Sequence, residues 1–354
     1  MSLSDASQRL LPLVEADLHQ VIAVPHPDLA AYYGMMHYHQ GWVDEALRPI
    51  VTQGGPAKAS GTGKRLRPLL CLLVCEAAGG DAEQALPASS AIELIHGFSL
   101  IHDDIEDSSP LRRGRRAVWN VWGVPHAVNA GDGLFVLACL ALHRLADRGV
   151  PAHRCLAAGL ALDQACLALC EGQYFDMSFE SYPAVDLDQY LWMIRHKTAT
   201  LLAVSAQLGA MVATDDTELI GRCFAFGLNL GMFFQIQDDL LGAWGDEHVT
   251  GKSAATDIRD RKKTLPVVYA LNHPDDPDGV RQLAELYARP GELDPPAIQV
   301  VLHLLDRLGA RRYAENTAEE YYRLALASLD ETGMENAAQS HLRELAASLS
   351  HRQT

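Results

Sequence analysis

Apolar residues recur at three- and four-residue steps along almost the whole chain, and this periodicity restricts the fold more than any other feature. Two examples are Ala91, Ile92, Leu94, Ile95, Phe98 and Ile101, and then Leu156, Leu160, Leu167 and Leu169. Such spacing places apolar side chains on one face of an α-helix. Sustained alternation of apolar and polar residues, which is typical of strands, is missing from the sequence. The pattern therefore predicts an all-α protein.

Several of these expected helices are apolar nearly all round, which indicates that they lie in the middle of a large bundle. Gly- and Pro-rich breaks separate them, but no break is long enough to be a domain linker, and no repeat of fixed period is present. We therefore predict one large helical domain over residues 1–354. Residues 1–55 form an expected N-terminal helical extension without recognised motifs.

The net charge and the positions of the cysteines restrict which partners the protein binds and in which cellular compartment it is found. The chain has 45 acidic and 29 basic residues, a net charge of −16, which is the wrong sign for a general nucleic-acid binder. Its seven cysteines lie mostly inside apolar runs, as reduced core thiols do. Uninterrupted apolar runs such as 133–142 are shorter than the roughly 20 residues of a membrane helix. We expect a cytoplasmic protein without a membrane span or bound nucleic acid.

An acidic motif ends one strongly apolar helix, where Asp103, Asp104 and Asp107 follow His102. At about 100° per residue, these three carboxylates share one helical face. They repel one another unless a cation joins them, and Mg²⁺ suits such oxygen ligands because it completes its shell with water and substrate phosphates. Taken alone, the motif fits a solvated acidic helix end equally well.

A basic cluster, Arg112–Arg116, follows within five residues. Arginine presents a planar fork of donors that matches phosphate oxygens in pairs. The alternative is that these arginines only pair with the neighbouring acids. Carboxylates and arginines one loop apart favour a site for a metal and a diphosphate.

A second acidic helix carries Gln235, Asp238 and Asp239 on one stripe, and Lys252 and Lys262 follow it. Two acidic helices that face one another across a bundle would hold Mg²⁺ between them, with the lysines on the phosphates. Each motif alone is a weak signal, but the ordered set is a strong one.

These motifs resemble those of the trans-type polyprenyl diphosphate synthases, the polyprenyl synthetase family, and most of all the geranylgeranyl diphosphate synthases. The resemblance runs from about residue 61 to about 271. It implies a large helical bundle of the isoprenoid synthase type with a central active-site cavity, a homodimer, and about three Mg²⁺ ions when substrate is bound. Asp103, Asp104, Asp107, Asp238 and Asp239 match the metal-binding positions.

The resemblance also assigns substrate-binding roles. Four residues would bind the diphosphate of isopentenyl diphosphate: Lys64, Arg67, His96 and Arg113. The residues that would contact the allylic diphosphate or line its site are Arg112, Gln173, Lys197, Thr198, Gln235, Lys252 and Lys262. Asp103, Asp104, Arg112 and Lys197 match the catalytic positions. Outside this context, His96 would be a core histidine, and Lys197 and Thr198 a helix surface pair.

One position departs from the family pattern. Gly242 stands where the second motif usually has a third aspartate, so one carboxylate is missing from the face of Asp238. From the sequence alone, Gly242→Asp is expected to restore it and to lower the Mg²⁺ concentration needed for turnover.

The resemblance implies head-to-tail condensation of isopentenyl diphosphate with an allylic diphosphate. One alternative is a type I terpene cyclase, which needs no isopentenyl diphosphate site, so Lys64, Arg67, His96 and Arg113 argue against it. Another is a non-catalytic subunit of a heteromeric synthase, although such subunits typically lose aspartates that this chain keeps.

Product length depends on the floor beneath Asp103. Phe98 and Ser99 lie about one turn deeper, and an aromatic residue followed by a small one resembles the twenty-carbon arrangement of the family. We expect geranylgeranyl diphosphate, with farnesyl diphosphate or longer chains as alternatives. Phe98 would also fit as ordinary core.

Overall fold

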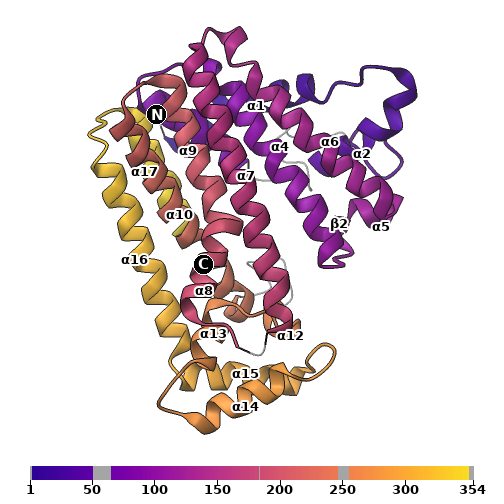
Figure 1. The fold of residues 1–354 in the computed structure, drawn as a ribbon, viewed down its shortest axis with the longest axis vertical. Coiled ribbons are helices and arrows are strands. Elements are labelled where there is room, and N and C mark those ends of the chain that lie inside the picture. The colour runs from indigo at the N-terminus through magenta and orange to yellow at the C-terminus, as the bar shows by residue number, and fades with distance from the viewer. Residues whose placement is uncertain (1, 51–64, 183, 246–254, 351–354) are drawn as a thin grey trace. The chain divides into compact units, whose positions relative to one another are not determined.

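The all-α prediction is confirmed. The computed structural model describes residues 2–50, 65–182, 184–245 and 255–350, and the only strands within them are the two of one short hairpin (Figure 1). Its elements are α1 (Leu3–Val21), η1 (Pro27–Leu29), α2 (Ala30–Gln40), α3 (Leu66–Ala77), α4 (Ala82–Glu106), β1 (Leu111–Arg112), β2 (Arg115–Arg116), α5 (Val118–Trp122), α6 (Val124–His143), η3 (Ala146–Arg148), α7 (Ala152–Ser181), α8 (Leu187–Ile194), η4 (Arg195–Ala199), α9 (Thr200–Ala213), α10 (Thr217–Trp244), α12 (Thr256–Arg259), α13 (Leu265–Leu271), α14 (Pro277–Tyr287), α15 (Pro295–Arg307), α16 (Ala310–Asp330) and α17 (Ala337–Ser350).

The contacts divide the chain into two compact units. Unit 1 contains Met1–Cys166, Val204–Phe224 and Thr332–Leu342. Unit 2 contains Leu167–Ala203, Ala225–Glu331 and Arg343–Thr354. That the whole chain is a single domain stays a prediction.

Helix α4 is the centre of unit 1, where it packs against α1, α3 and α6. Asp81 caps its N-terminus by accepting a hydrogen bond from the backbone N–H of Glu83. Residues on all sides of α4 are buried, including the polar Ser89, Ser90 and Glu93. This matches the expected helix that is apolar nearly all round, and its last turn carries the first acidic motif.

A two-residue hairpin loop follows α4. Strands β1 and β2 pair antiparallel, with Leu111 opposite Arg116 and Arg112 opposite Arg115. The loop residues Arg113 and Gly114 both have positive φ, 53° and 73°, which is the pattern of a type I′ turn. The basic cluster is therefore presented on a hairpin rather than on a helix.

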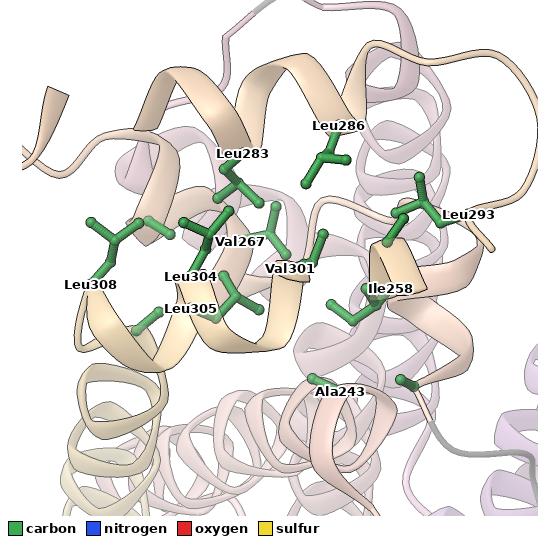
Figure 2. Close-up of a cluster of buried hydrophobic side chains, with 14 residues drawn as sticks. Ala243, Ile258, Val267, Leu283, Leu286, Leu293, Val301, Leu304, Leu305 and Leu308 are labelled. Atoms are coloured by element: carbon green, nitrogen blue, oxygen red, sulfur yellow. The ribbon is translucent and has the colours of Figure 1, made fainter. Parts of the chain in front are cut away.

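The buried core of unit 2 lies between α12, α13, α14 and α15, and Figure 2 shows its aliphatic side chains converging. Within unit 2, α13 also contacts α8 and α16. Thr264 precedes α13 in extended conformation and Pro266 follows at its first turn, where the missing N–H costs no intrahelical hydrogen bond. This core fixes the start of α13, which contacts the second acidic motif.

Two expectations about apolar residues need correction. Leu156, Leu160 and Leu167 are exposed rather than buried, because they lie on an open face of α7. None of the seven cysteines forms a disulfide, as predicted, but Cys170 is exposed and Cys139 and Cys155 are only half-buried, so these three are not core thiols.

Three helical segments of the described chain are long and apolar enough, by length and composition alone, to cross a membrane: Val124–Arg148, Ala152–Phe179 and Thr217–Trp244. The sequence argument considered only uninterrupted apolar runs, and helices that tolerate a few polar residues exceed that limit. The absence of a membrane span therefore stays a prediction.

Candidate functional site

The last turn of α4 brings the first acidic motif against Arg112 in unit 1. The Arg112 guanidinium donates from Nε to Asp104 Oδ1 and from a terminal nitrogen to Asp103 Oδ2, both at 2.8 Å. Asp107 ends the helix, and its N–H donates to the carbonyl of Asp103 at 2.9 Å. The fork of Arg112 thus holds two of the three carboxylates in place.

Asp104 is the most buried of these carboxylates, with only 1% of its surface exposed. Burial raises its pKa to about 6, against the opposing effect of the hydrogen bonds from Arg112. Its second oxygen, Oδ2, is buried and has no hydrogen-bond partner. A buried acceptor without a partner is costly, so this atom is suited to a cation or a donor that arrives with substrate.

No group of three or more Asp, Glu, His or Cys side chains is placed to hold a metal ion among the residues that the structure describes. The expected gathering of Asp103, Asp104 and Asp107 around one point is therefore not seen in this structure. Arg112 supplies the physical reason, since its positive charge relieves the repulsion between Asp103 and Asp104 and takes one oxygen of each.

A group of basic residues lies in the same unit. A terminal nitrogen of Arg67 lies 3.2 Å from Nε2 of His96, within hydrogen-bonding distance. Burial, then the charges of Arg67 and Arg113, lower the pKa of His96 well below its usual value, so His96 is neutral. Arg113 is half-buried, and burial lowers the pKa of its guanidinium, which still stays charged. Lys64 lies outside the described residues.

In unit 2, Asp239 is buried at the junction of three helices. Its carboxylate accepts hydrogen bonds from the hydroxyl of Tyr190 on α8, from the backbone N–H of Leu265 at 3.0 Å, and from Nε2 of Gln235 at 3.1 Å. Burial raises the pKa of Asp239 to about 7, although all three donors act to lower it. These contacts make Asp239 an anchor that ties α10 to α8 and α13.

Gln235 extends this network. Its amide oxygen accepts a hydrogen bond from the Thr198 hydroxyl at 2.8 Å. The sequence prediction placed Thr198 and Gln235 in one site, and the structure brings them together. The half-buried Asp238 is the neighbouring carboxylate of the motif.

The space beside Gly242 is filled by another acidic side chain. A Cβ built on Gly242 would lie 1.8 Å from Oδ2 and 2.5 Å from Cγ of Asp257, which belongs to α12. The charge of Asp257 also acts on Asp239, whose pKa it raises. Asp257 therefore places a carboxylate where the family pattern has its third aspartate.

Lys197 lies in η4, a short π-helical segment between α8 and α9, and its ammonium group is paired with Asp176 of α7. A Cβ added to Gly172 would lie 2.2 Å from the backbone nitrogen of Lys197. Only glycine therefore allows α7 to pack this closely against the backbone of η4. Gln173, the next residue, is buried at 9% exposure. The three predicted residues Gln173, Lys197 and Thr198 thus belong to one part of unit 2.

The two predicted phosphate lysines have different outcomes. Lys262 is exposed, and its backbone N–H donates to the carbonyl of Asp257 at 2.8 Å, across a turn that includes Arg261 at a φ of 55°. Lys252 lies outside the described residues.

The predicted chain-length residues both lie on α4. Phe98 is 8% exposed, and its ring makes edge-to-face contacts with His102 and with Phe135 of α6, at centroid distances of 5.7 and 5.4 Å. The Ser99 hydroxyl donates to the carbonyl of His96 at 2.9 Å.

Sequence reasoning missed four residues of these clusters: His39, Asp176, Tyr190 and Asp257. Asp176 lies three residues after Gln173 on the same helix but received no role. Asp257 is five residues before Lys262, a spacing that carries no signal without the turn between them. Tyr190 is a single residue in a short helix, and only packing reveals its partner Asp239. His39 is one of two histidines in α2, and only packing places it near His96.

Comparison with known proteins gives consistent results. The family described as polyprenyl synthetase matches residues 50–302. A geranylgeranyl diphosphate synthase of Mycobacterium tuberculosis is 38% identical over 330 residues, which cover 92% of this chain and 89% of that protein. A (2E,6E)-farnesyl diphosphate synthase of Mycobacterium bovis is 36% identical over 315 residues, covering 88% of this chain and 84% of that protein.

Solved structures agree over nearly the full length. A polyprenyl synthetase from Streptomyces coelicolor has a TM-score of 0.83 and 30% identity, and the match covers 98% of both chains. A geranylgeranyl pyrophosphate synthetase from Pyrococcus horikoshii has a TM-score of 0.84 and 30% identity, covering 99% of this chain and 98% of that one. The chain therefore belongs to the polyprenyl synthetase family, and it is a trans-prenyl diphosphate synthase, a prenyltransferase.

Proposed function

We propose that this synthase condenses isopentenyl diphosphate with an allylic diphosphate, head to tail and with Mg²⁺, and that its main product is geranylgeranyl diphosphate. One observation carries the proposal. Unit 1 holds the basic side chains Arg67, His96 and Arg113 beside carboxylates that are paired through Arg112. The first group suits a diphosphate without metal, and the second suits one that arrives with a cation.

The residues present fit a divalent cation. All candidate ligands are carboxylate oxygens, the donors that Mg²⁺ prefers, and Asp104 Oδ2 is a buried acceptor without a partner. We propose Asp103, Asp104 and Asp107 in unit 1, and Asp238 with Asp239 in unit 2, as the residues that hold it. Asp257 adds a further carboxylate beside Gly242. When bound, Mg²⁺ supplies positive charge that neutralises a diphosphate leaving group.

The side chains would act by positioning and by charge. Arg112, Lys197, Lys252 and Lys262 would hold the allylic diphosphate, with Gln173, Thr198 and Gln235 lining its site. As the allylic carbon–oxygen bond breaks, the double bond of isopentenyl diphosphate forms the new carbon–carbon bond. The departing pyrophosphate accepts the proton that is lost. None of these residues acts as a nucleophile.

Arg112 has a double role in this scheme. In this structure its guanidinium satisfies Asp103 and Asp104. A cation would compete for the same oxygens, and Arg112 would then turn its donors to phosphate oxygens. Its fork geometry suits both carboxylate and phosphate.

Product length is the finer part of the proposal. The bulky and nearly buried Phe98, backed by Phe135, supports a floor beneath the first acidic motif. The relatives are named as geranylgeranyl and as farnesyl diphosphate synthases, so product length needs its own test. The test is mass analysis of products from isopentenyl diphosphate with primers of five, ten and fifteen carbons. A twenty-carbon limit supports the proposal, and a fifteen-carbon or a much longer limit contradicts it.

Two other functions predict different results when the purified chain is assayed for turnover. A type I terpene cyclase would turn over an allylic diphosphate alone. A non-catalytic subunit would release no pyrophosphate as a single purified chain. The basic group around Arg67 argues against the first, and the retained aspartates argue against the second.

We also propose a cytoplasmic homodimer without bound nucleic acid. Apolar side chains on α6 and α7 in unit 1 support an interface, since Val136, Leu140, Leu156 and Leu160 are each more than half exposed. Light scattering after gel filtration tests it, with twice the chain mass of 38.6 kDa expected and the single-chain mass contradicting it.

A further inference from the structure

The last turn of α2 lies in the N-terminal extension, where the sequence showed no motif, yet its three residues Tyr38, His39 and Gln40 each lie against arginines of unit 1. Consecutive helical residues point about 100° apart, so one turn can reach three different partners. Tyr38 lies at the hairpin, Gln40 lies at the start of α3, and His39 stands between them in the sequence.

Tyr38 fixes the hairpin that carries Arg112 and Arg113. It is buried at 3% exposure, and its hydroxyl donates to the carbonyl of Arg116 at 2.8 Å. The Arg115 guanidinium lies 4.0 Å over the Tyr38 ring and donates to the Tyr38 carbonyl at 3.2 Å. Tyr38 thus anchors β2, the strand that pairs with Arg112 on β1.

Gln40 fixes the start of α3, which carries Arg67. Its amide oxygen accepts a hydrogen bond at 2.7 Å from Arg65, a buried arginine that also pairs with Glu15 and Glu93. Arg65 directly precedes α3 and has a φ of 48°, a strained conformation that these three hydrogen-bonding partners and packing maintain. Arg67 follows two residues later.

His39 lies between these two anchors and faces the basic group itself. It lines a small cavity together with Arg112, Arg113 and Arg115. Its ring also lies beside Gly97, the residue after His96. The distance is 3.6 Å from the ring atom Cδ2 to the point where a Cβ added to Gly97 would lie. Among the described residues, no hydrogen bond to the His39 imidazole is found.

A second donor without a partner points to the same place. Nε2 of Gln40 is buried and has no hydrogen-bond partner, and it lies 3.3 Å from the same Cβ position on Gly97. Burial, then the charges of Arg113 and Arg112, lower the pKa of His39, so its imidazole is neutral and offers one N–H. Two neutral donors without acceptors, next to several arginines, suit an anion.

The cavity limits what can enter. Asp104 also lines it: Arg112 takes its Oδ1, whereas its Oδ2 is the buried acceptor without a partner described above. Its volume of about 20 Å³ accommodates one water-sized group. One terminal oxygen of a diphosphate has that size.

We propose that the turn Tyr38–Gln40 is part of the isopentenyl diphosphate site, and that His39 donates a hydrogen bond to one terminal oxygen of that diphosphate. This inference rests on the proposed function. It assigns a substrate contact to the N-terminal extension and gives Tyr38 and Gln40 the role of positioning residues for Arg113 and Arg67.

Three variants test it. His39→Phe keeps a ring but removes the donor, and His39→Gln keeps a donor. His37→Phe is the matched control on the same helix, because the His37 imidazole bonds to the Ile22 carbonyl at 2.9 Å and does not line the cavity. For each variant, KM for isopentenyl diphosphate, KM for the allylic diphosphate, kcat and melting temperature are measured.

We expect His39→Phe to raise KM for isopentenyl diphosphate about tenfold to a hundredfold, with KM for the allylic substrate and kcat within about twofold, because a hydrogen bond to a charged group is lost. His39→Gln should recover part of that loss. His37→Phe should lower the melting temperature and leave both KM values unchanged. Equal changes in the two KM values, or an unchanged KM for isopentenyl diphosphate in His39→Phe, would overturn the inference.

A binding experiment separates this inference from the proposed function. Calorimetric titration with inorganic diphosphate in the presence of a chelator requires no turnover. If inorganic diphosphate binds His39→Phe more weakly than the wild type, the contact is supported. If the protein then shows no condensation, only the proposed function is refuted. Equal binding to both proteins would refute the contact even if condensation is observed.

Discussion

Gly242→Ala is the substitution whose outcome depends most directly on the packing of the second acidic motif. The new Cβ would lie 1.8 Å from Asp257 Oδ2, far inside contact distance, so the Asp257 side chain has to turn away. Removing a glycine from a helix gains up to about 1 kcal/mol. Overpacking costs about 1–3 kcal/mol. We therefore expect a net change between about zero and 2 kcal/mol of destabilisation.

The effect on metal use should be larger than the effect on stability. If the Asp257 carboxylate serves where the family has its third aspartate, turning it away raises the Mg²⁺ concentration for half-maximal rate. Gly242→Asp should behave in the same way, because two carboxylates would compete for one space. This is the opposite of what the sequence alone predicts for that substitution.

Gly221→Ala is the matched control, because it lies in the same helix and a Cβ there has no neighbour within 4 Å. It should raise the melting temperature and leave the Mg²⁺ requirement unchanged. The measurements are thermal unfolding without metal and a Mg²⁺ titration of pyrophosphate release. If Gly242→Ala stabilises the protein as Gly221→Ala does and needs no more Mg²⁺, the role given to Asp257 is wrong.

Four further substitutions test separate parts of the site. Asp103→Ala should reduce turnover below about a tenth of wild type at saturating Mg²⁺ with an unchanged helical circular dichroism spectrum, since it removes a ligand rather than core; higher activity would contradict the metal assignment. Arg113→Ala should raise KM for isopentenyl diphosphate more than KM for the allylic substrate, and equal increases would remove the distinction between Arg112 and Arg113. Phe98→Ala should open a cavity and shift products beyond twenty carbons by mass analysis; an unchanged product length would place the floor elsewhere. Tyr190→Phe should lower stability by about 1–3 kcal/mol in thermal unfolding, because a buried acceptor loses a donor, and an unchanged melting temperature would show that the Tyr190 hydroxyl contributes nothing.

Helical periodicity was enough to predict the fold class, because apolar residues at this spacing form a continuous face on a helix but not on a strand. Periodicity did not distinguish a buried stripe from an exposed one: Leu156 and Leu160 follow the same pattern as Ile92 and Ile95, but only the second pair is buried. An apolar face that is left open looks the same in sequence as one that is covered. The hairpin was also missed, since its two-residue strands are too short to show alternation.

The motifs indicated which residue types belong together, but not how they share hydrogen bonds. Arg112 was assigned to phosphate, and the structure pairs it with Asp103 and Asp104. Asp239 was grouped with the metal ligands, and it accepts three hydrogen bonds from its own unit. The Arg112 pairing is local and matches the alternative that the sequence left open for the basic cluster. The hydrogen bonds from Tyr190 and Leu265 to Asp239 come from helices distant in sequence, so no local pattern predicts them.

The most direct test of the account is pyrophosphate release by the purified chain with isopentenyl diphosphate alone, with an allylic diphosphate alone, and with both, each with Mg²⁺ and with a chelator. We predict release only when both substrates and Mg²⁺ are present. Release from the allylic diphosphate alone, release that survives the chelator, or no release under any condition would contradict the proposed condensation.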